Sequence, residues 1–287
     1  PSEQLEKAIN LLIDQAMPAE YWEEILLPAR IGAYRPDMLD NLLASGNIFW
    51  RMDKYKTLCF SKYEDLDWDA DMTSVAESLD GNERIIYEAL LKRGASFMQR
   101  LSGLIEGDTP FDILSQLTEK GLVTADSFLP VRQLINKNVI QKAQAKTRAF
   151  ARAKAMTTGR YEIIRPLKEL STEQLLDRDF DRYIILCRET IQSIPWAKAL
   201  ETLRVWEYTG RVRRGYFIDG LSGIQFIRDK DYEKVMQQLE KPYEELIWIP
   251  AIDPFQVWGK ILKHMPDRSF MNLAQTVVAL HCGKPVA

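Results

Sequence analysis

The sequence has no apolar run that could cross a bilayer, because no stretch reaches the roughly 18 residues that a transmembrane helix needs. Its start is polar and acidic, without the apolar core of a secretory signal peptide. The few cysteines, Cys59, Cys187 and Cys282, lie far apart and indicate neither a disulfide framework nor a zinc site. His264 and His281 have no Glu or Cys partner at metal-ligand spacing, so we expect no metal. We therefore expect a cytoplasmic protein without a membrane partner.

The composition is that of a globular protein, with 46% apolar and 28% charged residues, but the charge is uneven. Residues 132–168 contain ten Lys and Arg against one acid, whereas residues 1–80 contain 16 acids and 7 bases. A local excess of this kind says more about partners than the net charge of −3 does. Any bound nucleic acid should therefore avoid the acidic face of the first region.

One pattern recurs at residues 39–48, 114–123 and 203–212. Each copy has two large apolar residues three positions apart, then a Gly, then a β-branched residue that begins a strand. Apolar residues three apart share a helix face, and Gly suits the left-handed position that ends a helix. A helix that stops at Gly and leads directly into a strand is how a recognition helix joins its wing. The pattern thus favours winged helices, although other α+β arrangements contain the same unit.

The repeat predicts an α+β fold with tandem winged-helix domains followed by the start of a small β-barrel. We place winged-helix units at 1–80, 81–136 and 171–240, a basic linker at 137–170, and a truncated barrel-like region at 241–287. Apolar spacing predicts helices at 82–92, 96–104 and 181–191, and alternation predicts a hairpin at 215–227. The absent initial Met and the stop within a predicted hairpin indicate a piece of a longer chain.

Three segments resemble the C-terminal region of large helicase-related (Lhr) proteins. Residues 210–226 resemble that family's glycine-rich wing signature, residues 27–40 resemble its LPAR-containing stretch, and residues 251–254 with 277–287 resemble its barrel. The resemblance implies a piece of an ATP-dependent DNA-translocating helicase that acts in DNA repair. It also implies an architecture similar to that of winged-helix DNA glycosylases, and some family members remove uracil.

The sequence departs from both activities that the resemblance implies. It lacks the G-x-x-x-x-G-K-[ST] loop that cradles nucleotide phosphates, so we expect no cofactor in this piece. ATP and Mg²⁺ are expected only for the motor domains of the parent chain, which are an expected partner. The Gln-x-Gln or Gln-x-Asp triplet of the glycosylase class is also missing. We predict no catalytic residue, and whether this piece is an enzyme stays open.

Two basic groups are the candidates for nucleic-acid binding. The first surrounds the start of the third wing, and it consists of Arg204, Arg211, Arg213 and Arg214. The second lies in the basic linker at three- and four-residue spacing, and it consists of Lys142, Lys146, Arg148, Arg152 and Lys154. Both can contact phosphates without reading base sequence. The alternatives are a charged strand edge for the first group and a solvated loop for the second.

Other candidates have weaker support from the sequence. Trp206, Tyr216 and Phe217 can stack on bases, but such residues more often fill a small core. Asp253 can activate water for cleavage of a glycosidic bond, but Asp-Pro also begins many turns. The prediction is a module that clamps DNA electrostatically, with RNA as the alternative nucleic acid. A glycosylase-like module and a protein-interaction or homo-oligomer scaffold are the competing functions.

Overall fold

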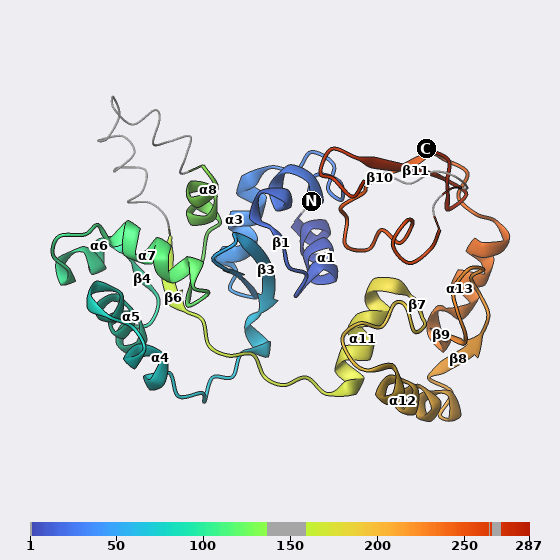
Figure 1. The fold of residues 1–287 in the computed structure, drawn as a ribbon, viewed down its shortest axis with the longest axis horizontal. Helices are drawn as coiled ribbons and strands as arrows, with labels where there is room; N and C mark the ends of the chain where they lie inside the picture. Colours follow the sequence, from blue (N-terminus) through green and yellow to red (C-terminus); the bar gives the residue numbers. More distant parts are fainter. Residues whose placement is uncertain (1, 137–158, 264, 266–270) are drawn as a thin grey trace. The chain divides into compact units, whose positions relative to one another are not determined.

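The computed structural model describes residues 2–136, 159–263, 265 and 271–287, which Figure 1 draws in colour. The chain divides into two compact units, Pro1–Lys168 and Glu169–Ala287, and each is described by itself. Each unit contains two three-stranded antiparallel sheets with helices packed beside them. The fold is therefore a mixed one of helices and strands. Among the described helices, none is long and apolar enough to cross a bilayer.

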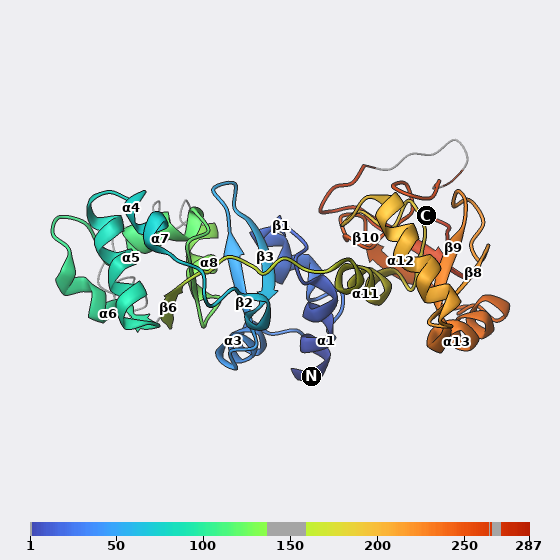
Figure 2. The same cartoon turned by 90° about the horizontal axis from the view of Figure 1, so that it is seen from below.

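The first unit begins with helices that lead into a hairpin, drawn in blue in Figures 1 and 2. The order is α1 (Ser2–Leu12), β1 (Met17–Pro18), α2 (Ala19–Tyr21), the π-helical η1 (Trp22–Leu26), α3 (Pro36–Ala44), β2 (Ile48–Met52) and β3 (Thr57–Lys62). Pro36 opens α3, where a missing N–H costs little, and Gly46, at φ 78°, follows its end. The strand order is β1-β3-β2, and the buried core includes Trp22, Trp50 and Phe60.

The rest of the first unit repeats this arrangement. After η2 (Tyr63–Asp65) and α4 (Thr73–Glu77) come α5 (Gly81–Arg93), β4 (Ser96–Phe97), α6 (Met98–Leu101), η3 (Ser102–Leu104), α7 (Pro110–Glu119), β5 (Val123–Ala125), α8 (Leu129–Ile135) and β6 (Arg160–Ile163). The strand order is β4-β6-β5. The expected helix at 96–104 thus begins with a short strand, because Ser96 pairs with Tyr161.

Strand β6 changes how the predicted linker is understood. Its residues were assigned to the basic linker at 137–170, but Tyr161 is paired with Ser96 on one side and with Ala125 on the other. The ring of Tyr161 is buried, which gives this short strand an apolar anchor. Along the chain, residues 126–159 therefore form the connection between the two hairpin strands of the second repeat. The lysines and arginines predicted at 142–154 fall in this connection, outside the described residues.

The second unit begins with a third copy of the arrangement. It contains α11 (Thr172–Tyr183), β7 (Ile185–Leu186), α12 (Trp196–Tyr208), β8 (Val212–Gly215), β9 (Gln225–Arg228) and α13 (Asp229–Glu240). A capping box between Ser171 and Gln174 starts α11 at Thr172, nine residues before the helix predicted at 181–191. That prediction was wrong, because Ile184 takes a positive φ of 62° and turns the chain into β7. The strand order is β7-β9-β8.

All three of these sheets share one topology. In each sheet the last strand in sequence (β3, β6 or β9) is the central one. It pairs on one side with the short strand that follows the first helix, and on the other side with the strand that follows the Gly-terminated helix. Gly46, Gly121 and Gly210 all have positive φ, as the repeated pattern predicts. The sequence repeat is thus a repeat of structure.

The C-terminal region forms a smaller sheet of β10 (Ile247–Pro250), β11 (Val277–His281) and β12 (Lys284–Pro285). Its order is β10-β11-β12, and the described residues form no closed barrel. The barrel therefore stays a prediction. Trp248 and Val277 are largely exposed on this open sheet.

Candidate nucleic-acid interface

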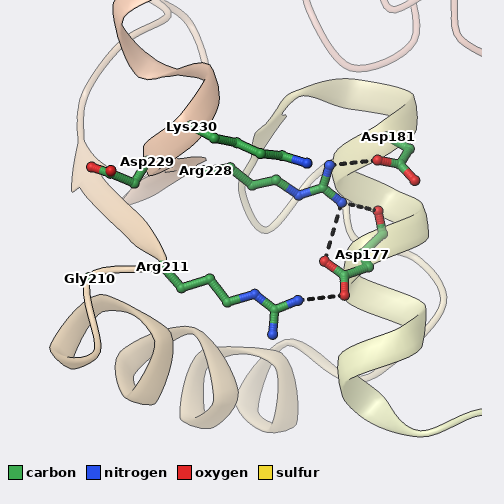
Figure 3. Close-up of a pocket in the computed structure, with 7 residues that line it drawn as sticks. All are labelled: Asp177, Asp181, Gly210, Arg211, Arg228, Asp229 and Lys230. Carbon is green, nitrogen blue, oxygen red and sulfur yellow. Dashed lines mark hydrogen bonds and ion pairs between the residues drawn. The ribbon is translucent and has the colours of Figure 1, made fainter.

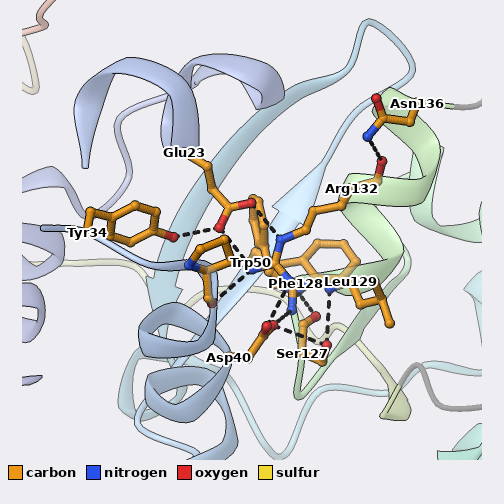
Figure 4. Close-up of polar contacts among 10 residues, drawn as sticks. Glu23, Tyr34, Asp40, Trp50, Ser127, Phe128, Leu129, Arg132 and Asn136 are labelled. Atoms are coloured by element: carbon orange, nitrogen blue, oxygen red, sulfur yellow. Dashed lines mark hydrogen bonds and ion pairs between the residues drawn. The ribbon is translucent and has the colours of Figure 1, made fainter. Parts of the chain in front are cut away.

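The three helices that precede the hairpins, α3, α7 and α12, occupy equivalent positions but expose different surfaces. In the first repeat, α8 packs against the helical segment before α3, and Arg132 of α8 reaches two acids, as Figure 4 shows. Arg132 Nε donates to Glu23 Oε2 at 2.6 Å, and its Nη1 donates to Asp40 Oδ2 at 2.7 Å. Arg132, one of the ten bases of the basic stretch, is therefore engaged inside the protein.

The residues before α8 strengthen this intramolecular contact. The backbone N–H of Phe128 donates to Asp40 Oδ1 at 2.7 Å, and Trp50 Nε1 donates to the carbonyl of Ser127 at 3.0 Å (Figure 4). The ring of Phe128 is fully buried and stacks on Phe60, with 5.9 Å between ring centroids. Helix α3 thus uses a carboxylate of its own to hold another part of the chain.

Helix α7 of the second repeat has little free surface. Its buried residues include Ile113, Leu114 and Leu117, together with the polar Ser115 and Thr118 on its other sides. It contacts α5 on one side and β2 of the first repeat on another. A helix enclosed in this way cannot enter a groove of nucleic acid.

Helix α12 of the third repeat differs from α7 because only its inner face is covered, and it differs from α3 because its exposed face carries cations. Ala199, Leu203 and Trp206 are buried in the domain core. Its outer face is exposed, and it carries Lys198, Glu201, Arg204, Val205 and Tyr208. Within the described part of the chain, neither Lys198 nor Arg204 has a carboxylate partner. These two cations are therefore available to a ligand.

The three arginines at the start of the third wing, Arg211, Arg213 and Arg214, are called the wing arginines. Arg211, the first of them after α12 in the sequence, is already paired. Arg211 Nη2 donates to Asp177 Oδ2 at 2.6 Å, and its guanidinium lies 3.6 Å from the centre of the Trp206 ring. Asp177 and Asp181 of α11 also hold Arg228, whose Nη1 donates to Asp181 Oδ1 at 2.5 Å (Figure 3). One acidic face of α11 thus neutralises two arginines.

The other two wing arginines are paired on opposite sides of β8. Arg213 Nε donates to Asp229 Oδ1 at 2.6 Å and its guanidinium lies over the ring of Tyr232, both of which belong to α13. Arg214 Nε lies 3.0 Å from Glu207 Oε1 on α12. All three pairs are about half exposed, so each contributes at most about 1 kcal/mol, and a phosphate can compete for the arginines.

A cavity of about 570 Å³ opens between α11, the end of α12 and the start of α13. Three acids and three bases line it, as Figure 3 shows, and they are Asp177, Asp181, Asp229, Arg211, Arg228 and Lys230. The charges in this cavity balance, so its walls do not favour an anion over a cation.

The predicted site residues are thus divided among three situations. Arg204 is exposed and free of carboxylates in the described structure, while Arg211, Arg213 and Arg214 are paired within their own domain. The basic group of the predicted linker lies outside the described residues, and it consists of Lys142, Lys146, Arg148, Arg152 and Lys154. Their contact with nucleic acid stays a prediction.

The structure also sorts the aromatic candidates. Trp206 belongs to the core, and Phe217 packs against Tyr232 with 6.2 Å between ring centroids. Tyr216 is exposed, as stacking requires. Sequence reasoning missed Tyr208, which lies one helical turn beyond Arg204 and therefore on the same outer face.

A second polar cluster lies in the C-terminal region. Asp253 is buried, and Lys260 Nζ donates to its backbone carbonyl at 2.8 Å. Burial lowers the pKa of Lys260, against the opposing charge of Asp253. Nearby in sequence, the side-chain amide of Gln256 is buried and neither of its polar atoms has a hydrogen-bond partner in the described structure. A buried amide without a partner is costly, so this amide has unused hydrogen-bonding capacity.

Comparison with known proteins identifies two segments of the chain. Two family models, both described as a winged-helix domain of the large helicase-related protein, match the chain. One matches residues 2–58 and the other matches residues 165–246. These matches cover the first and third repeats, including α3 and α12.

Two curated relatives align with nearly the whole chain. The Lhr helicase/uracil glycosylase of Escherichia coli (strain K12) is 27% identical over 304 residues, which is 89% of this chain and 19% of that protein. The Lhr helicase/probable uracil glycosylase of Mycolicibacterium smegmatis is 26% identical over 328 residues, covering 98% of this chain and 21% of that protein. The chain spans about a fifth of the length of these relatives.

Proposed function

This chain is a C-terminal Lhr-like region with two winged-helix domains of the large helicase-related family, and we propose that it is the nucleic-acid-binding module of such a helicase. The proposed ligand is DNA, with RNA as the alternative. The proposed partners are the motor domains of the same parent chain, where ATP and Mg²⁺ would bind. A role in DNA repair in the cytoplasm is part of the proposal.

One observation carries this proposal. Of the three equivalent helices, α12 is the one that exposes cations, Lys198 and Arg204, whereas the exposed residues of α3 include Asp37 and no base, and α7 is enclosed on several sides. A winged helix normally presents this helix to the major groove, with the wing beside it on the backbone. Lys198 and Arg204 then contact phosphates, and Arg214 joins them by exchanging Glu207 for a phosphate.

We also infer that the second repeat is a winged helix. Its support is the strand order β4-β6-β5, which is equivalent to the orders of the two matched domains. The connection between β5 and β6 is then its wing. The basic residues of this connection extend the proposed clamp, and this rests on the charge of the sequence alone.

The test is the salt dependence of DNA binding, measured by fluorescence anisotropy with a labelled duplex. Reversing Lys198 and Arg204 to Glu should weaken binding roughly tenfold or more and lower the salt slope by about 2 for two lost phosphate contacts. Arg35→Glu is the control, since Arg35 is an exposed arginine of the first domain paired only with its neighbour Asp37. Equal losses in both proteins would remove α12 from the interface.

These two positions test α12 better than the wing arginines do. Reversing Arg211 to Glu would place a new acid beside Asp177, and reversing Arg213 would do the same beside Asp229. Such a variant would lose domain stability as well as positive charge. Lys198 and Arg204 have no carboxylate partner in the described structure, so their reversal changes the surface without breaking an ion pair.

Base removal is the second candidate function, and the polar cluster at Asp253 favours it. The curated relatives carry the names uracil glycosylase and probable uracil glycosylase. A buried carboxylate near an amide with unused hydrogen bonds has the groups that base excision needs, one to activate water and one to read a base edge. Incubation with a uracil-containing oligonucleotide followed by alkaline cleavage tests it. Strand breaks that disappear with Asp253→Asn support the candidate, and intact strands at high protein concentration reject it for this chain.

A further inference from the structure

Two tyrosines stand out at the proposed interface because they expose more of their side chains than any other large apolar residue described. Tyr208, at the last position of α12, is 94% exposed, and Tyr216, just after β8, is 81% exposed. Exposing an aromatic ring forgoes the stabilisation of burying it in a core. Two such rings beside free cations call for a ligand with apolar flat surfaces and negative charge.

Tyr216 directly follows β8, and the contacts of the neighbouring residues indicate which way it faces. Arg213 of β8 and Phe217, two residues beyond its end, both contact Tyr232 of α13, so these odd-numbered positions face α13. Arg214 contacts Glu207 of α12, so the even-numbered positions face α12. Side chains alternate along a strand, and we infer that the alternation continues one residue past Gly215, which puts Tyr216 on the α12 side with Arg214.

The outer face of α12 continues this surface. Arg204 and Tyr208 are four residues apart and therefore adjacent on one helix face. Val205, which is 60% exposed, adds an apolar patch beside them. Glu207, the residue before Tyr208, is held by Arg214 at 3.0 Å. The exposed face of α12 thus carries an aromatic ring, an apolar side chain and a guanidinium group next to one another.

From this arrangement we propose that Tyr208 and Tyr216 form a stacking platform for unpaired bases, so that the third winged helix prefers single-stranded nucleic acid. Aromatic rings that stack on bases and cations that follow the backbone are the two components of sequence-tolerant single-strand binding. Duplex DNA hides the faces of its bases within the helical stack and offers the tyrosines only its backbone and groove edges. Arg204 and Lys198 neutralise phosphates of the strand whose bases lie on the rings.

Charge distinguishes this ligand from a protein partner. The outer face of α12 with Arg214 carries three cations, Lys198, Arg204 and Arg214, against two acids, Glu201 and Glu207. Two of these cations have no partner among the described residues. A second copy of the chain would bring the same positive excess to the contact, whereas a nucleic-acid strand complements it.

The experiment compares a labelled oligothymidylate with a blunt duplex of the same length, using the full chain. This inference rests on the proposed function, so wild-type protein that binds neither probe overturns both. The double substitution Tyr208→Ala and Tyr216→Ala should weaken single-strand binding by about tenfold per tyrosine and change duplex binding by less than about twofold. Because both rings are exposed, their removal leaves the fold intact. The matched control is Tyr55→Ala, since Tyr55 is an exposed tyrosine of the first domain.

A second pair of variants separates stacking from hydrogen bonding. Tyr208→Phe with Tyr216→Phe keeps the rings and should retain single-strand binding, and a fluorescent adenine analogue in the strand should be quenched by wild type but not by the double alanine variant. Equal weakening for strand and duplex would overturn the platform while leaving the charge-based function standing. Unchanged binding by the alanine variant, or loss of self-association in its place, would also overturn it.

Discussion

The first and third winged-helix domains have the same strand order but use their equivalent helices in opposite ways. In the first domain, Glu23 and Asp40 pair with Arg132 from another part of the chain, and the exposed residues of α3 include the acid Asp37 and no base. In the third domain, Lys198 and Arg204 project from the exposed face of α12. The difference lies in the sign of a few charges on one fold.

The comparison shows why matching a fold to a function requires the charges of the individual helix. A winged helix with acids at this surface recruits a cation of its own protein. A winged helix with unpaired cations there is available to a polyanion. The same argument separates the wing arginines from Arg204, since an acid of the third domain already holds each wing arginine.

Of the predicted changes, removal of Arg132 should have the largest effect. It tests whether Arg132 neutralises the acids of the first domain. Arg132→Ala leaves Glu23 and Asp40 without their shared partner, and all three side chains are mostly shielded, with 21%, 17% and 32% exposure. We expect the first unit to lose about 2 to 3 kcal/mol of unfolding free energy, at or just below the range for removing one partner of a buried pair. Urea denaturation of the full chain measures this loss.

The control for Arg132 is Arg35→Ala. Arg35 also pairs with an acid, Asp37, but both side chains are more than half exposed. Such a pair contributes between 0 and about 1 kcal/mol. If the two variants lose equal stability, α8 is not anchored through Arg132 and the acids of the first domain are not neutralised in the way described.

The sequence could predict the features that depend on neighbouring residues. It could not predict those that depend on residues far apart in the chain. The glycines that end α3, α7 and α12 act locally, so the repeat predicted three helix-to-hairpin units. The first strand of each of the three repeated sheets has only two residues, as at Ser96–Phe97, and forms because a distant strand pairs with it. No local pattern identifies such a strand.

The surroundings of the site residues could be predicted only in part for the same reason. The exposure of Arg204 follows from the helix period, because the apolar Leu203 and Trp206 mark the inner face of α12. The pairing of Arg211 with Asp177 joins positions 34 apart, and that of Arg132 with Glu23 joins positions 109 apart. Neither pair follows from spacing, so the sequence did not show that acids of the same chain hold Arg211 and Arg132.

Neutralising Asp177 should increase the affinity of the third domain for nucleic acid, because it frees the charge of Arg211. Asp177→Asn removes the carboxylate that holds Arg211 at 2.6 Å and that also contacts Arg228 at 3.2 Å. We expect nucleic-acid affinity to rise about threefold, with a salt slope steeper by up to about 1 for one added phosphate contact. Anisotropy titrations at several salt concentrations measure both quantities.

The matched control removes one negative charge elsewhere in the same domain. Glu240 at the exposed end of α13 has no ion pair among the described residues, so Glu240→Gln changes the net charge equally without freeing an arginine. A gain of the same size in both variants would mean that affinity responds to total charge, and the arginine at the wing would then have no special part.

The smallest expected effect concerns a buried acid of the third domain, Asp179. Ser193 Oγ donates to its Oδ2 at 2.8 Å, and Arg182 lies 3.6 Å away. Burial raises the pKa of Asp179, and the Ser193 hydrogen bond and the Arg182 charge only partly oppose it. Its carboxylate is thus less well compensated than Glu23 and Asp40, which share the close contacts of Arg132.

The raised pKa of Asp179 sets the sign of a pH effect. A carboxyl with a higher pKa in the folded state binds a proton more readily there, so its contribution to stability increases as the pH falls from neutral toward its unfolded value of about 3.9. Relative to Asp179→Asn, which cannot titrate, the wild-type domain should therefore gain stability as the pH is lowered from 7 to 4, by less than about 1.4 kcal/mol per pH unit. Urea denaturation of both proteins at the two pH values measures the difference. A constant difference would mean that Asp179 keeps its ordinary pKa, and an increase in the opposite direction would mean that Arg182 outweighs burial, making this acid as well paired as those of the first domain.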